Sequence, residues 1–180
     1  VPWQAGETIS TSIGQSFVLV TPIQMARLAS AIFNGGILYQ PKVVRWVGKG
    51  ERMVYRFEPS VLSRVEAKPE NLERIQRALV AVVNEPHGTG WRAKIQGVRV
   101  AGKTGTAQVV NMETEKAGTK GKIVPEKYRD HAWFVAVAPA KDPKIAVSVL
   151  VENAGHGGSV AAPIAERMIR AHLGLEESGG

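Results

Sequence analysis

Four consecutive residues, Lys103-Thr104-Gly105-Thr106, combine a cation, two hydroxyl groups and a glycine in the middle of an apolar run. Val98 and Val100 precede them and Val109 and Val110 follow, and such β-branched residues predict a strand. Glycine weakens the interior of a strand and often marks a place where a backbone or a ligand comes close. The combination therefore predicts a strand whose edge takes part in binding or catalysis.

A phosphate-binding loop is one alternative for the same residues. Residues 97–104, Gly-Val-Arg-Val-Ala-Gly-Lys-Thr, match the pattern G-x-x-x-x-G-K-[ST] letter for letter. Such a loop must leave a strand, wrap a phosphate with backbone N–H groups and open a helix at its Lys-Ser/Thr. Here the inner residues are strand formers, and Gly105-Thr106-Ala107 is a poor start for a helix. The sequence context disfavours this alternative, and a nucleotide-binding assay would test it.

The strand needs neighbours, and two further runs after it have the pattern of strands. Residues 133–138 are apolar throughout, which is typical of a strand covered on both faces, and residues 145–151 place β-branched side chains at every second position. Asp142-Pro143 supplies a turn between them. A polar stretch at 111–130 leads to these strands, and connections of that length are usually functional or disordered. We therefore expect an antiparallel meander of about three core strands.

Helices are predicted before and after this sheet from capping residues and from the helical spacing of apolar side chains. The signals, in chain order, are Thr21-Pro22 with a stop at Gly35-Gly36, then Pro69 with an end near Asn84, then Ser159 as the cap of a last helix. Residues 42–47 and 53–57 predict a hairpin around Gly48-Lys49-Gly50, and residues 1–20 are expected to be loop. The pattern indicates one mixed α and β domain over residues 1–180, an antiparallel sheet flanked by helices.

Composition and charge exclude several other classes of protein. The chain of 180 residues has no cysteine, which excludes thiolate zinc sites, thiol nucleophiles and disulfides. The net charge of +7 includes five basic residues between 116 and 129, but nucleic-acid binding also needs aromatic residues for stacking, and this stretch offers only Tyr128. The four histidines lack the spacing of a metal site. No apolar run reaches the length of about 18 residues needed to cross a membrane.

A set of motifs along nearly the whole chain resembles the class B penicillin-binding proteins. In order these are Trp3, Gly6-Glu7-Thr8-Ile9, Ser12-Ile13-Gly14-Gln15, Val20-Thr21-Pro22-Ile23-Gln24, Asn34-Gly35-Gly36, Ala101 to Gln108, His131-Ala132-Trp133-Phe134-Val135 and Ala161-Ala162-Pro163. The Ile-Gly-Gln at 13–15 and the Val-Glu-Asn-Ala-Gly-His-Gly-Gly at 151–158 look most like the elongation-type branch, penicillin-binding protein 2. Ser16 departs from the glycine expected after Gly14-Gln15.

This resemblance implies a fold, an activity and partners. The fold would be that of penicillin-binding proteins and serine β-lactamases. The activity would be that of a peptidoglycan D,D-transpeptidase, which cross-links stem peptides through a serine acyl-enzyme and is inactivated by β-lactam antibiotics. It implies no cofactor and no metal. Further implied are a glycosyltransferase partner of the elongation machinery and a place on the periplasmic side of the bacterial inner membrane, with an anchor outside this chain.

The resemblance also implies roles for the Lys-Thr-Gly residues. Lys103, Thr104 and Gly105 match the catalytic motif, and Lys103 would place a cation beside the proton network of the nucleophile. Thr104 and Thr106 would bind the carboxylate of substrate or drug, and the Thr106 N–H would supply half of an oxyanion hole. Gly105 would leave space for the substrate to lie along the strand edge. The alternative for Lys103 is an exposed lysine that protects a strand edge from aggregation.

The nucleophile of such an enzyme is not found in the sequence. No serine is followed by lysine three positions later, and no Ser-x-Asn occurs. We therefore expect both motifs to lie upstream, with this chain as the C-terminal portion of the transpeptidase domain, inactive alone. The alternative from another class is a non-catalytic sensor or scaffold that recognises β-lactams on the same fold.

Overall fold

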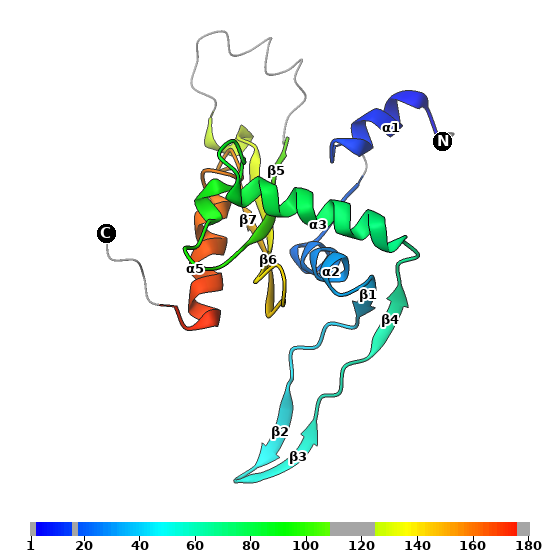
Figure 1. Ribbon diagram of the computed structural model, residues 1–180, viewed down its shortest axis with the longest axis vertical. Coiled ribbons are helices and arrows are strands. Elements are labelled where there is room, and N and C mark those ends of the chain that lie inside the picture. The colour runs from blue at the N-terminus through cyan, green and yellow to red at the C-terminus, as the bar shows by residue number, and fades with distance from the viewer. Residues whose placement is uncertain (1–2, 16–17, 109–124, 176–180) are drawn as a thin grey trace.

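A three-stranded antiparallel sheet forms the centre of the molecule in the computed structural model, which describes residues 3–15, 18–108 and 125–175 (Figure 1). The strand order is β5-β6-β7, with β5 at Ala101–Ala107, β6 at His131–Ala138 and β7 at Ile145–Val151. This confirms the predicted meander. The first strand begins three residues later than Val98, and Val109 and Val110 lie outside the described residues.

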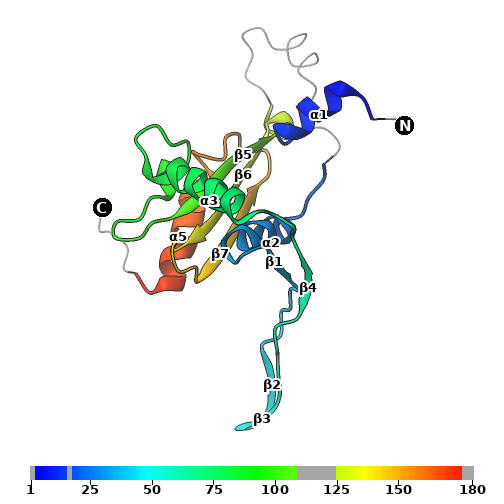
Figure 2. The same cartoon turned by 45° about the vertical axis from the view of Figure 1, so that its right-hand side comes forward.

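The two faces of the sheet are covered by different helices. The helix α5 at Ala161–Leu173 packs on β6 and β7 from one side, and α2 at Pro22–Phe33 packs on the same strands from the other side (Figures 1 and 2). The helix α3 at Pro69–Asn84 contacts β5 and also touches α2. The core on the α5 side contains the fully buried Val83, Phe134 and Ile169. Burial of both faces explains the continuous apolar run of β6.

The starts of α2 and α3 follow from their local sequences. Thr21 caps α2: its side chain accepts the N–H of Gln24, and the Gln24 side chain accepts the Thr21 N–H, which is a capping box. Proline stands at the first position of each helix, where its missing N–H costs nothing. The predicted limits Pro22 and Pro69 to Asn84 are confirmed.

Three expectations for the rest of the chain need correction or addition. Residues 1–20 are not all loop, because Ala5–Ser12 form the helix α1. Ser159 is not the cap of the last helix, since its hydroxyl donates to the carbonyl of His156 and Val160 precedes the first helical residue. A short pair, β1 at Ile37–Tyr39 with β4 at Val61–Arg64, was not predicted.

The predicted hairpin is confirmed as a projecting arm. The strands β2 at Trp46–Lys49 and β3 at Arg52–Arg56 pair antiparallel, and they extend away from the body of the molecule (Figures 1 and 2). Two short 3-10 turns, η1 at Trp91–Ala93 and η2 at Glu126–Tyr128, complete the described elements. None of the helices in the described ranges is long and apolar enough to cross a membrane.

Candidate active site

The Lys-Thr-Gly residues lie on the outer edge of the sheet. β5 pairs only with β6 among the described strands. The Thr106 carbonyl oxygen accepts a hydrogen bond from the Gln15 side chain (Nε2, 3.0 Å), so it points away from β6. In an antiparallel pair the N–H and C=O of one residue point the same way, and alternate residues point outward. The N–H and C=O groups of Thr104 and Thr106 therefore line the free edge, which we call the Lys-Thr-Gly edge (residues 103–106).

Lys103 is exposed at this edge. Its Nζ donates to the carbonyl oxygen of Thr104 at 2.7 Å, and it forms no ion pair within the part of the chain that the structure describes. The ammonium group thus lies beside outward-facing backbone groups, with no carboxylate of the described residues in an ion pair with it. An exposed cation of this kind can turn towards a nucleophile or an anionic substrate by exchanging this hydrogen bond for another.

Thr104 lies against a second hydroxyl. The Thr104 and Thr89 Oγ1 atoms are 3.0 Å apart, close enough for one to donate to the other. A Cβ added to Gly158 would lie 3.4 Å from the Thr104 methyl group, so the turn after β7 contacts the same side chain. Thr89 belongs to the turn between α3 and η1. The sequence gives no local signal for Thr89, because its pairing with Thr104 exists only in the tertiary structure.

Gly105 serves close packing within the protein, a role beyond the space for substrate that the sequence predicted. A Cβ on Gly105 would lie 3.0 Å from the Trp133 Cβ on the neighbouring strand. A Cβ on Gly157 would lie only 2.0 Å from the Trp133 carbonyl oxygen and 2.5 Å from that of Gly105. The Gly157-Gly158 turn therefore presses on the backbone of the Lys-Thr-Gly edge where β5 and β6 pair.

The start of β5 is held by α3 and by an aromatic ring. The Asn84 side chain at the end of α3 donates to the carbonyl oxygens of Val80 and Val100, each at 2.7 Å. A Cβ on Gly102 would lie 2.6 Å from the Phe134 ring, so this glycine lets the buried ring come close to β5. Both contacts restrain the position of β5 relative to α3 and β6. The phosphate-loop alternative is wrong, because residues 101–107 form one continuous strand and no helix opens at Lys103-Thr104.

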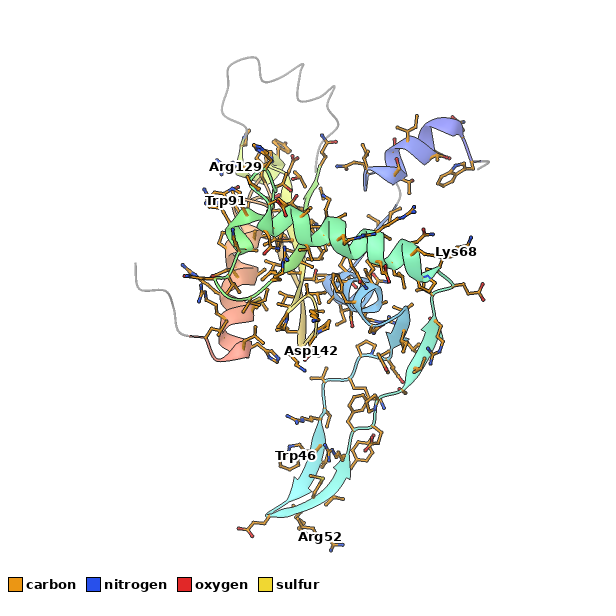
Figure 3. The ribbon with its side chains drawn as sticks, viewed as in Figure 1. Trp46, Arg52, Lys68, Trp91, Arg129 and Asp142 are labelled. Atoms are coloured by element: carbon orange, nitrogen blue, oxygen red, sulfur yellow. The ribbon has the colours of Figure 1, made fainter. Side chains whose placement is uncertain are left out.

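An open pocket adjoins the Lys-Thr-Gly edge. It has a volume of about 520 Å³, and two histidines, an arginine and an exposed tryptophan are among the residues that line it. The full lining is Pro86, His87, Gly88, Thr89, Trp91, Arg92, His156, Gly158 and Ser159. In Figure 3 Trp91 lies towards the opposite end of the sheet from Asp142. His156, in the glycine-rich segment 151–158, lines this pocket. No group of metal-binding side chains occurs in the described ranges.

Comparisons with known proteins identify the family. The family described as the penicillin binding protein transpeptidase domain matches residues 2–170. The chain is 38% identical over 175 residues to the peptidoglycan D,D-transpeptidase MrdA of Haemophilus influenzae, an alignment that covers 96% of this chain and 26% of that protein. It thus spans about a quarter of the length of this curated relative.

Solved structures agree with this assignment. Penicillin-binding protein A of Mycobacterium tuberculosis, as its ceftriaxone acyl-enzyme complex, matches with a TM-score of 0.74 and 33% identity, over 91% of this chain and 35% of that one. Penicillin-binding protein 2 of Helicobacter pylori, in complex with MreC, matches with a TM-score of 0.68 and 26% identity, over 96% of this chain and 28% of that one. The chain therefore belongs to the penicillin-binding protein transpeptidase family, and several of its relatives, those of Haemophilus influenzae and Salmonella typhimurium among them, are named MrdA.

Proposed function

We propose that this chain forms part of a peptidoglycan D,D-transpeptidase that works through a serine acyl-enzyme. The observation that carries the proposal is the Lys-Thr-Gly edge itself. An exposed lysine, two threonines and outward-facing backbone groups stand together on a strand edge with no strand partner among the described residues. An extended peptide can add to such an edge as a further strand.

Each group of the edge has a use in acyl transfer. The serine oxygen, supplied by a Ser-x-x-Lys segment outside these 180 residues, bonds to the peptide carbonyl carbon and passes its proton to a basic group beside it, which later gives that proton to the leaving amine. The outward N–H of Thr106 stabilises the negative charge on the carbonyl oxygen. The amide bond then breaks, and the leaving amine takes up a proton. An amine of a second stem peptide next attacks the ester, loses its proton and frees the serine. Losing one donor to the developing oxyanion, such as the Thr106 N–H, typically costs about a hundred-fold or more in rate.

Lys103, Thr104 and Thr106 supply the remaining charge and hydrogen bonds. The Lys103 ammonium favours loss of the serine proton by placing a positive charge near the serine oxygen. The hydroxyls of Thr104 and Thr106 bind the terminal carboxylate of the peptide or the carboxylate of a β-lactam. The contact between Thr89 and Thr104 supports this role, since Thr89 can donate to Thr104 Oγ1 while Thr104 donates to the carboxylate.

The partners follow from the same proposal. The substrates are peptidoglycan stem peptides, and β-lactam antibiotics act as inhibitors at the same edge. A glycosyltransferase of the elongation machinery would supply the strands to be cross-linked, and an MreC protein is a second candidate partner, because a relative has been solved in complex with one. The reaction would take place on the periplasmic side of the inner membrane.

Labelling with a fluorescent penicillin tests the proposal. We expect no covalent label on the 180-residue chain, and a label on the Ser-x-x-Lys serine of the longer polypeptide that contains it, located by mass spectrometry of peptides. An adduct on a serine of this chain, or an unlabelled longer polypeptide, would contradict the proposal. A labelled polypeptide that forms no cross-linked peptides when given glycan strands would instead favour the non-catalytic sensor or scaffold.

A further inference from the structure

Gln15 reaches the Lys-Thr-Gly edge from a distant part of the chain. Its Nε2 donates to the Thr106 carbonyl oxygen at 3.0 Å across a separation of 91 residues, and the contact is partly buried. Figure 1 shows α1 beside the sheet, with its C-terminal end towards β5, and Figure 2 shows the same neighbourhood after rotation. The bond ties a segment that otherwise stands apart to the strand that carries Lys103 to Thr106.

Local sequence explains why Gln15 points there. The Gly14 N–H donates to the Thr11 carbonyl and the Gln15 N–H donates to the Ser10 carbonyl, both at 3.0 Å. Gly14 has a φ of 79°. These are the two hydrogen bonds of a Schellman motif, which ends a helix through a residue in the left-handed region, usually glycine. The Ile-Gly-Gln sequence therefore ends α1 and fixes the direction in which residue 15 leaves it.

Thr106 lies where β5 needs an additional restraint. The strand ends one residue later, at Ala107, whose pair on β6 is His131. Strand ends open locally more easily than strand centres. On its outer side β5 has no strand partner among the described residues, so Gln15 supplies a restraint that a neighbouring strand would otherwise give.

We propose that Gln15 is a positioning residue that holds the end of β5 so that the Thr106 N–H faces outward in the orientation acyl transfer needs. This inference rests on the proposed function, in which that N–H stabilises the developing oxyanion. A carbonyl oxygen has two lone pairs, so the Gln15 bond leaves one for a substrate amide. Gln15 thus restrains the edge without closing it.

Hydrogen exchange on the 180-residue chain tests the restraint independently of activity. Since Thr104 and Thr106 face outward, Ala107 and His131 bond to each other in the β5–β6 ladder, and their amides report on the strand end. Gln15→Met keeps the side-chain length and removes the donor. We expect exchange at these two amides to become about five- to ten-fold faster, the usual effect of one lost hydrogen bond. Gln15→Lys, which keeps an N–H donor, should restore slow exchange.

Two more variants separate the side chain from its helix. Gly14→Ala retains Gln15 but strains the turn at positive φ, so it should also accelerate exchange at the two amides. Ser12→Ala removes an exposed hydroxyl that donates only to the Ile9 carbonyl of the same helix, and it should change nothing. Unchanged exchange in Gln15→Met, or equal acceleration in Ser12→Ala, would overturn the restraint.

Acylation kinetics in the longer polypeptide test the consequence for the reaction. Gln15→Met should lower the acylation rate constant for a penicillin about ten-fold and leave the constant for its initial non-covalent binding within two-fold, since Gln15 acts through the oxyanion donor. Gln15→Lys should recover most of the rate. Faster acylation or tighter binding in Gln15→Met would mean that Gln15 blocks the edge, and would overturn the inference. If the unsubstituted polypeptide is not acylated, the proposed function is wrong, and so is the catalytic role inferred for Gln15. The hydrogen-exchange result would still decide whether Gln15 restrains the end of β5.

Discussion

Replacing Gly157 with alanine should disturb the Lys-Thr-Gly edge more than any other single methyl group added near it. The new Cβ would lie 2.0 Å from the Trp133 carbonyl oxygen, about 1.4 Å less than the 3.4 Å at which ordinary contact begins. It would also lie 2.5 Å from the Gly105 carbonyl oxygen. Both neighbours are backbone atoms in a paired ladder, so neither can rotate away as a side chain could.

The size of the effect follows from this geometry. Overpacking of a well-packed site costs roughly 1–3 kcal/mol, and a clash with two backbone atoms belongs at the upper end. We expect the free energy of unfolding to fall by about 3 kcal/mol, which lowers the Tm of a chain this size by roughly 6–12 °C. Urea unfolding followed by circular dichroism measures the change.

Two other glycines provide matched controls. Gly155 has a φ of 87° and no atom within 4 Å of an added Cβ, so Gly155→Ala tests backbone strain alone and should cost about 1 kcal/mol. Gly6 lies in α1 with no atom within 4 Å and no positive φ, so Gly6→Ala should leave stability unchanged or raise it slightly. Equal losses in Gly157→Ala and Gly155→Ala would refute the close contact between the turn and the edge.

Two further substitutions test how the edge is held and what it does. Asn84→Ala removes the hydrogen bond that joins α3 to Val100, the residue before β5, together with a second bond to Val80 inside α3. We expect a loss of about 1–3 kcal/mol in urea unfolding, and a loss under about 0.5 kcal/mol would contradict the role of the bond to Val100. Lys103→Ala should change stability by less than about 0.5 kcal/mol, because the side chain is exposed. In the longer polypeptide the same change should slow acylation by a penicillin about a hundred-fold or more, measured by stopped flow. Unchanged acylation would leave Lys103 as an exposed lysine that only protects a strand edge.

Much of the fold could be predicted because its signals are local. A cap and a proline within one turn define where α2 begins, and alternating β-branched residues over seven positions define β7. The same kind of signal placed Lys103 to Thr106 on a strand. The predictions that were wrong also rested on local signals. Ser159 has the chemistry of a cap, but its hydroxyl donates back to the His156 carbonyl. The glycine, threonines and serines of α1 give that helix only a weak periodicity.

By itself, the sequence determined which residues are candidates for the chemistry and that they lie on one strand, since both depend on residues only a few positions apart. Only the tertiary structure decided that Thr104 and Thr106 are the residues whose backbone groups face outward from the edge that the sequence predicted, because that depends on how the strands pair. It also decided the contacts of Gln15 with Thr106, Thr89 with Thr104 and Gly157 with Gly105. The two residues of each pair are 91, 15 and 52 positions apart, respectively. No periodicity or capping rule reaches across such separations.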